Sequence, residues 1–131
     1  MGEACKLSCS HCSYNKKVFL GFGFRYMNLI SILEWYKDDE GKQRISEFMN
    51  EKDTTFDCFD GLYVCHKCHY QLNEVYLHIS SESQTYTNSY ICPRCTAPMP
   101  SMPLDNLQNN ALDCPECGQE KLEVNFYMDW D

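Results

Sequence analysis

The segment Leu62-Tyr63-Val64-Cys65-His66-Lys67-Cys68 places two cysteines three positions apart at the end of a short apolar run. Two cysteines at this spacing form a tight turn, here called a knuckle, in which both sulfurs face one point. Two knuckles together supply the four thiolates of a tetrahedral metal site. This knuckle is the second of four along the chain, so the sequence predicts two closed metal sites.

The other three knuckles are Cys9/Cys12, Cys92/Cys95 and Cys114/Cys117, numbered first, third and fourth. Together the four use eight of the ten cysteines of a 131-residue chain. A set of four thiolates is typical of structural zinc. We therefore predict two Zn²⁺ ions, each held by four cysteines, and the expected metal ligands are Cys9, Cys12, Cys65, Cys68, Cys92, Cys95, Cys114 and Cys117.

The spacing leaves open which knuckles share a metal. We favour a sequential scheme, in which Cys9/Cys12 joins Cys65/Cys68 and Cys92/Cys95 joins Cys114/Cys117. The eighteen residues 96–113 between the last two knuckles are a comfortable ribbon spacing, and this scheme has the lowest loop entropy apart from one insert that can fold locally. One rival joins the second knuckle to the third, across 23 residues, and the first to the fourth. Another interleaves alternate knuckles.

Short strands and two helices are expected around the knuckles. Alternating or apolar runs at 18–26, 62–64, 74–79 and 121–127 indicate strands. Apolar residues recur at helical spacing within 28–37, with Asn28 as a plausible cap, and more weakly within 42–52. The predicted fold is a small, metal-stabilised α+β protein. It has two zinc-ribbon units of short antiparallel hairpins, residues 1–82 and 83–131, with a two-helix insert at about 28–52 in the first.

These motifs resemble those of small bacterial tandem zinc-ribbon proteins with rubredoxin-like knuckles, whose function is uncharacterised. The resemblance implies two structural zincs and supports the sequential pairing, but it implies no activity. It covers nearly the whole chain and is carried by Cys9-Ser10-His11-Cys12, the aromatic–glycine stretch from Phe19 to Phe24, Leu62 to Cys68, Tyr90-Ile91-Cys92-Pro93-Arg94-Cys95, Leu112-Asp113-Cys114-Pro115-Glu116-Cys117-Gly118 and Asp129-Trp130-Asp131.

The chain departs from such ribbons after the second cysteine of each knuckle. Glycine is common there because the backbone turns with φ > 0. Only Gly118 follows this rule, while Ser13, His69 and Thr96 occupy the other three positions. Thr96 is β-branched and therefore the least comfortable, so the geometry of the third knuckle is the one most in question.

Cys5 and Cys58 lie outside the knuckles. Cys58 stands beside Phe56 and Phe59, which predicts a buried, inert thiol. Cys5 is expected to be a second spare thiol. The histidines in or beside knuckles, His11, His66 and His69, are expected to point outward rather than bind metal.

Composition bears on location and partners. The N-terminus lacks the basic start and apolar run of a signal peptide, and no apolar stretch reaches the ~18 residues of a membrane span, so we expect a cytoplasmic protein. The formal charge is −8, and two zincs with four thiolates each would take it to about −12. Proteins bind nucleic acids mainly through Lys and Arg side chains that neutralise phosphates, so the negative charge argues against a nucleic-acid partner.

The leading hypothesis is a non-enzymatic zinc-ribbon module that mediates protein–protein interaction. No Ser/His/Asp set, His-Glu-x-x-His or spaced carboxylate pair is visible, and eight cysteines in two sets of four leave no open coordination position. One alternative is a nucleic-acid or transcription-associated ribbon, with Tyr14 and Phe24 stacking on bases beside Lys16, Lys17 and Arg25. Another is a redox or iron protein that uses its Cys-x-x-Cys pairs.

Overall fold

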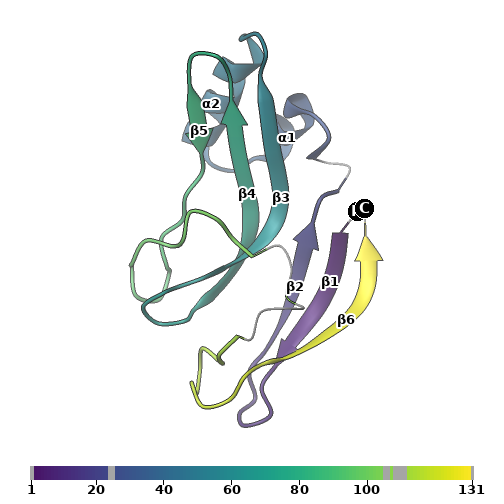
Figure 1. Cartoon of the computed structure of the whole chain (residues 1–131), viewed down its shortest axis with the longest axis vertical. Coiled ribbons are helices and arrows are strands. Elements are labelled where there is room, and N and C mark those ends of the chain that lie inside the picture. The colour runs from purple at the N-terminus through teal and green to yellow at the C-terminus, as the bar shows by residue number, and fades with distance from the viewer. Residues whose placement is uncertain (1, 24–25, 105–106, 108–111, 131) are drawn as a thin grey trace.

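A computed structural model describes residues 2–23, 26–104, 107 and 112–130. Over these residues the chain forms a small α+β structure with one six-stranded antiparallel sheet, in the order β5-β4-β3-β2-β1-β6, and two helices (Figure 1). The strands are β1 (Gly2–Ser8), β2 (Asn15–Gly21), β3 (Thr55–Val64), β4 (Gln71–Ser80), β5 (Thr85–Thr87) and β6 (Glu123–Trp130), and the helices are α1 (Leu29–Trp35) and α2 (Asp39–Met49).

The first and last strands of the chain are neighbours in the sheet. β1 pairs with β2 on one side and with β6 on the other, and the pair Gly2↔Trp130 brings the two ends together. Figure 1 shows the start of β1 beside the end of β6. β1 was not among the predicted strands, because its apolar residues do not alternate regularly.

The sheet has two halves that meet at a short junction. β3 and β4 form a long hairpin with ten paired positions, whereas β2 joins β3 through the pair Gly21↔Asp60. The Asn73 side chain reinforces this junction: its amide donates to the carbonyls of Phe19 and Gly61, each at 2.9 Å, and its oxygen accepts the Phe19 N–H at 2.8 Å.

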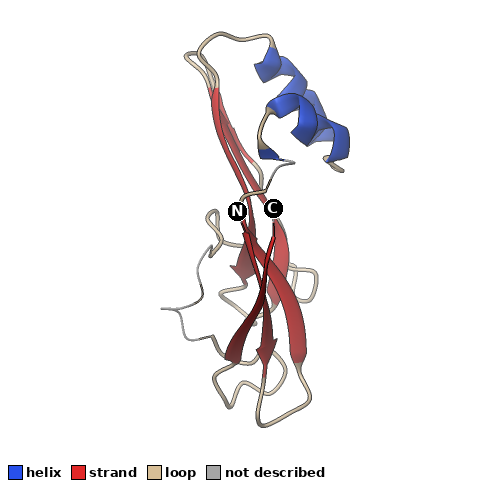
Figure 2. Ribbon diagram, turned by 90° about the vertical axis from the view of Figure 1, so that its right-hand side faces the viewer, coloured by secondary structure: helices blue, strands red, loops and turns tan. Residues whose placement is uncertain are grey.

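Both helices pack on one face of the sheet, at the end away from the knuckles (Figure 2). Two helices are thus present within the predicted range 28–52. Asn28 is the N-cap of α1, since its side-chain oxygen accepts the Ser31 N–H at 2.8 Å. The apolar faces of the helices bury Ile32, Ile45 and Phe48 against the strands; the strand residues of this core are Cys58, Leu77 and Ile79.

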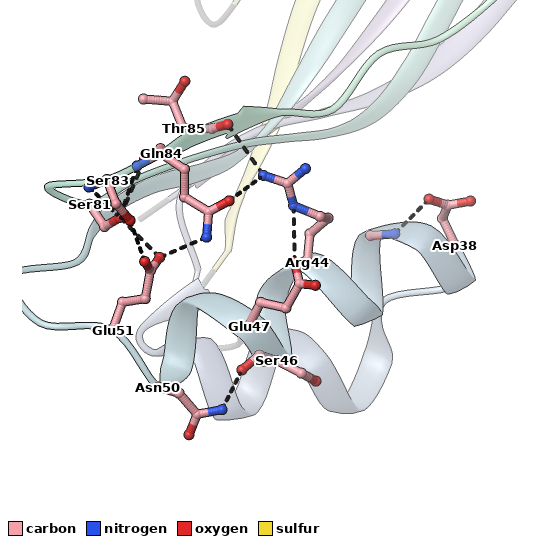
Figure 3. Close-up of polar contacts among 11 residues, drawn as sticks. Asp38, Arg44, Ser46, Glu47, Asn50, Glu51, Ser81, Ser83, Gln84 and Thr85 are labelled. Carbon is pink, nitrogen blue, oxygen red and sulfur yellow. Dashed lines mark hydrogen bonds and ion pairs between the residues drawn. The ribbon is translucent and has the colours of Figure 1, made fainter.

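A polar network fastens the end of α2 to the β4–β5 turn (Figure 3). The Glu51 carboxylate accepts hydrogen bonds from the hydroxyls of Ser81 and Ser83 and from the Gln84 amide. The Arg44 guanidinium donates to the Gln84 side-chain oxygen at 3.1 Å. These bonds complement the apolar packing of the helices and fix them over β4 and β5.

The predicted division into units 1–82 and 83–131 stays a prediction. Strands from both segments contribute to the same sheet, since β5 and β6 come from the second segment.

Candidate metal centres

Each knuckle lies between two paired backbone segments. The first connects β1 to β2, and the second connects β3 to β4. The third and fourth lie inside minimal ladders, marked by the bridges Ile91↔Pro98 and Asp113↔Lys121. The recurring pattern of a strand, a knuckle and a returning strand therefore follows from antiparallel pairing, which brings each pair of cysteines to the tip of a turn.

The structure brings the eight predicted cysteines together as two groups of four. One group is Cys9, Cys12, Cys114 and Cys117, and the other is Cys65, Cys68, Cys92 and Cys95; within each group all sulfurs lie within 4.8 Å of one another. All ten cysteines of the chain are free of disulfide bonds.

The spacing of the sulfurs matches the size of a zinc ion. In the first group the Sγ atoms of Cys9 and Cys117 are 3.7 Å apart and those of Cys12 and Cys114 are 3.6 Å apart. In the second group, Cys65–Cys95 and Cys68–Cys92 are each 3.5 Å apart. Tetrahedral Zn–S bonds of about 2.3 Å place sulfurs about 3.8 Å apart. The chemistry and geometry of both groups therefore fit a four-thiolate zinc site.

The favoured sequential pairing of knuckles is wrong. The first knuckle meets the fourth and the second meets the third, as in the nested rival scheme. The physical reason is the position of β6: it pairs with β1, so the turn that precedes β6 lies at the same end of the sheet as the β1–β2 turn (Figure 1). The pairing of β1 with β6 closes the long loop between the first and fourth knuckles. Loop entropy, which favoured the sequential scheme, therefore does not decide which knuckles share a metal.

The predicted positive φ after the knuckles is present in three of the four. His69, Thr96 and Gly118 have φ of 66°, 64° and 66°. In each case this N–H donates to the carbonyl of the first cysteine of its knuckle, at 2.9–3.0 Å. The third knuckle thus adopts the ordinary geometry in spite of its threonine. Ser13 is not among the residues with positive φ, so the first knuckle turns differently.

Hydrogen bonds lower the pKa of Cys114 in one group and of both Cys65 and Cys68 in the other, and so favour their thiolate forms. Burial raises the pKa of Cys114, but the backbone N–H groups of Cys117 and Glu116 outweigh it and the pKa falls to about 7. Burial likewise raises the pKa of Cys68, and the Tyr70 N–H together with Arg94 lowers it to about 6. These sulfurs are prepared for metal binding before a metal arrives.

One cysteine in each group, Cys12 or Cys95, has a raised pKa instead. The Tyr14 N–H lowers the pKa of Cys12, but burial and the sulfurs of Cys114, Cys9 and Cys117 outweigh it and raise the pKa to about 12. Cys95 behaves in the same way, with a pKa of about 12. A bound dication would displace these protons, so metal binding is expected to release protons.

Arg94 links the two groups. It lies inside the third knuckle, its Nη2 donates to the Cys68 carbonyl of the second, and its guanidinium covers the Tyr70 ring at 5.5 Å. Its Nη1 is 3.8 Å from the Glu116 carboxylate, which belongs to the fourth knuckle. One cation therefore contacts both candidate centres, each of which would carry a net charge of about −2 with zinc bound.

A second link joins the two centres. Tyr14 follows the first knuckle in the sequence and Gln71 follows the second. The Tyr14 hydroxyl donates a hydrogen bond to the Gln71 side-chain oxygen at 2.9 Å. Neither link was predicted from the sequence. A signal existed for the first: a base and an acid occupy corresponding places in Cys92-Pro93-Arg94-Cys95 and Cys114-Pro115-Glu116-Cys117.

Cys5 and Cys58 lie outside both groups and are buried, with 0% and 3% exposure. Cys58 packs with Phe56 in the core beneath the helices, as predicted. None of the four histidines belongs to a candidate metal group. Of the residues considered for base stacking, Tyr14 is engaged with Gln71, while Phe24 and Arg25 lie outside the described residues.

Comparisons of the chain with protein-family models, with curated proteins and with solved structures found no match. Within the part of the chain that the structure describes, none of the helices has the length and apolar character needed to cross a membrane. The interpretation of the metal centres therefore depends on their own geometry: eight cysteines form two groups that could hold two metal ions.

Proposed function

We propose that the protein is a non-enzymatic zinc-binding module, in which two structural Zn²⁺ ions hold two zinc ribbons in a nested arrangement. The observation that carries this proposal is the pair of four-cysteine groups with Sγ–Sγ distances of 3.5–3.7 Å. Four thiolates fill a tetrahedral coordination shell, so neither ion would keep an open position for water or substrate.

The small size of the cores supports the proposed structural role of the metal ions. The core around the first and fourth knuckles includes Cys9 and Cys114 themselves, together with leucines and a valine of the neighbouring strands. The core around the other pair is smaller and includes Cys65 and Cys92. A structural zinc contributes roughly 10 kcal/mol or more of apparent folding free energy in small peptides, which would stabilise both small cores.

A protein partner is proposed on the basis of surface character. The chain is acidic, with a formal charge of −8, which disfavours nucleic acid. β6 is an edge strand, and its residues Phe126, Tyr127 and Met128 are 41–51% exposed. Exposed apolar residues on a sheet edge are common in surfaces that bind other proteins. The module would thus present a rigid, zinc-held surface.

Native mass spectrometry of protein purified without added metal tests the zinc assignment. We expect two zincs in the wild type and one in each of Cys92→Ser and Cys114→Ser, because each substitution breaks a different group. Cys58→Ser removes a buried cysteine outside both groups and is expected to keep both zincs. Iron, or two zincs retained in Cys92→Ser and Cys114→Ser, would contradict the proposal.

A further inference from the structure

A cavity of about 1260 Å³ lies between the α1–α2 junction and the sheet. Its lining includes Trp35 and Tyr36 at the end of α1, Asp60 of β3, Val75 of β4 and the segment after β5. In β3 and β4 the pair Cys58↔Leu77 packs under the helices, and Asp60↔Val75 is the next pair on the same face. The cavity therefore begins on this face where the helical core ends.

Aromatic side chains supply much of the cavity wall. Phe19, Trp35, Tyr36, Tyr86 and Tyr90 all line it, and Phe19 is 42% exposed. A ring in this wall already takes part in a cation–π contact, since the Arg44 guanidinium of α2 lies 5.2 Å from the centroid of Tyr86. Aromatic faces of this kind attract further guanidinium or ammonium groups.

Hydrogen bonds hold the wall in a fixed shape. The buried Asn88 amide donates to the Tyr36 hydroxyl and to the Val75 carbonyl, both at 3.0 Å. The Tyr90 hydroxyl donates to the same carbonyl at 2.7 Å. The cavity is thus formed before a ligand arrives, which lowers the entropic cost of binding.

The charge of the lining is mainly negative. Carboxylates come from Asp38 and Glu40 at the start of α2, from Asp60 on β3 and from Glu74 on β4, and among the described lining residues Lys37 is the one cation. The whole chain carries a formal charge of −8, which also draws cations toward it.

We propose that this cavity, called the groove from here on, binds an extended arginine- or lysine-rich segment of a partner protein. The cationic side chains would lie against the aromatic wall and pair with the carboxylates of Glu40 and Glu74. The groove exceeds the roughly 300–1,000 Å³ of pockets for drug-sized ligands, so it has room for several residues. This inference deepens the proposed function and rests on its claim of a protein partner.

A short synthetic peptide tests the groove directly. The probe is acetyl-(Gly-Arg)₃-amide, added to the zinc-loaded full chain carrying Trp130→Phe, so that Trp35 of the groove is the remaining tryptophan. We expect a saturable change in Trp35 fluorescence that weakens as salt rises. The matching peptide with citrulline in place of arginine keeps the shape but lacks the charge, and is expected to bind at least about tenfold more weakly.

A matched pair of variants locates the site. Glu40→Gln removes a carboxylate that lines the groove, whereas Asp39→Asn removes the neighbouring carboxylate in the same first turn of α2, which does not line it. Both change the charge of the chain and of the helix terminus equally. We expect Glu40→Gln to weaken binding by up to about fivefold, the effect of losing an exposed ion pair, and Asp39→Asn to leave it unchanged.

Several results would overturn the inference. If Glu40→Gln and Asp39→Asn weakened peptide binding equally, the binding would be non-specific charge attraction. Spermidine binding as tightly as the peptide would assign the groove to small polyamines. A dimer in sedimentation that Glu40→Gln dissociates would assign the groove to a second copy of the chain. Failure of the peptide to bind a chain that holds both zincs rejects the groove alone, whereas absence of zinc rejects the proposed function first.

Discussion

Thr96 shows how the knuckle geometry is imposed on an unsuitable residue. A β-branched side chain disfavours positive φ, yet Thr96 has φ of 64° and donates its N–H to the Cys92 carbonyl at 2.9 Å. A residue other than glycine held in this region costs of order 1–3 kcal/mol. The third knuckle persists because its hydrogen bonds and its neighbouring sulfurs fix the backbone.

Thr96→Gly is therefore expected to stabilise the protein. Relief of the strain outweighs the extra backbone entropy of glycine, so we expect a gain of about 1 kcal/mol in the free energy of unfolding, measured by denaturant titration with zinc present. Ser13→Gly is the matched control, because position 13 has no positive φ, and it should give no gain. A stabilisation of equal size at both positions would contradict the argument.

Arg94 is the second residue with a specific expected effect. It contacts the Cys68 carbonyl, the Tyr70 ring and Glu116, and so supports the second metal group from outside its ligands. Loss of groups that support metal ligands commonly lowers metal affinity by about 10–100-fold. We expect Arg94→Ala to lower the zinc affinity of one site by about tenfold, measured by competition with a chromophoric chelator.

Arg44→Ala serves as the control for Arg94→Ala, since Arg44 contacts the β4–β5 turn rather than a knuckle. It should leave both zinc affinities unchanged. Unaltered zinc binding in Arg94→Ala would show that the guanidinium does not support the metal centre.

At the scale of elements, the position of the helices depends on both apolar and polar contacts. Sequence periodicity was sufficient to predict the helical insert and its Asn28 cap, because both are local signals. The network between Glu51 and the β4–β5 turn could not be predicted, because its members are about thirty residues apart and share no pattern.

Glu51 gives this contact a pH dependence. Hydrogen bonds from Ser83, Gln84 and Ser81 lower the pKa of its carboxyl group from the ordinary value of 4.5. A group whose pKa is lower in the folded state stabilises the fold above the unfolded pKa, and this contribution is lost as pH falls through the folded pKa. We expect Glu51→Gln to be less stable than the wild type at pH 7, and the difference to shrink below pH 4.5.

The free energy of unfolding of Glu51→Gln and of the wild type is measured by denaturant titration at several pH values. Taking the difference between the two proteins cancels any loss of zinc in acid that both share. Glu82→Gln removes a carboxylate of the same turn that takes no part in the hydrogen bonds of Glu51 with Ser81, Ser83 and Gln84, and it should show no such pH-dependent difference. A Glu51→Gln difference that is constant from pH 7 to pH 4 would mean that the hydrogen bonds do not depend on the charge.

At the scale of the whole molecule, the sequence was a good guide to which residues meet metal but a poor one to which of them meet each other. The Cys-x-x-Cys spacing identifies eight cysteines because a knuckle is a local structure. Pairing of knuckles depends on sheet order, and the pairing of β1 with β6 joins the two ends of the chain. The apolar pattern of β1 (Gly2–Ser8) is irregular, so neither this strand nor its pairing with β6 could be predicted.

The nested arrangement predicts how the molecule comes apart. Cys114→Ser removes a ligand of the group that holds the first and fourth knuckles together, so amide hydrogen exchange should rise in β1, β2 and β6. The helices have a separate apolar core with β3 and β4, and protection there should largely remain. Loss of protection over the third knuckle as large as that over β1 would instead favour the sequential pairing.

The most direct test of the nested metal centres is a two-dimensional ¹¹³Cd–¹H correlation spectrum of the cadmium-substituted protein. Cadmium replaces zinc at thiolate sites and couples to the β-protons of its own ligands. The structure predicts that one cadmium correlates with Cys9, Cys12, Cys114 and Cys117, and the other with Cys65, Cys68, Cys92 and Cys95. A cadmium that correlates with Cys9, Cys12, Cys65 and Cys68 together would contradict the account.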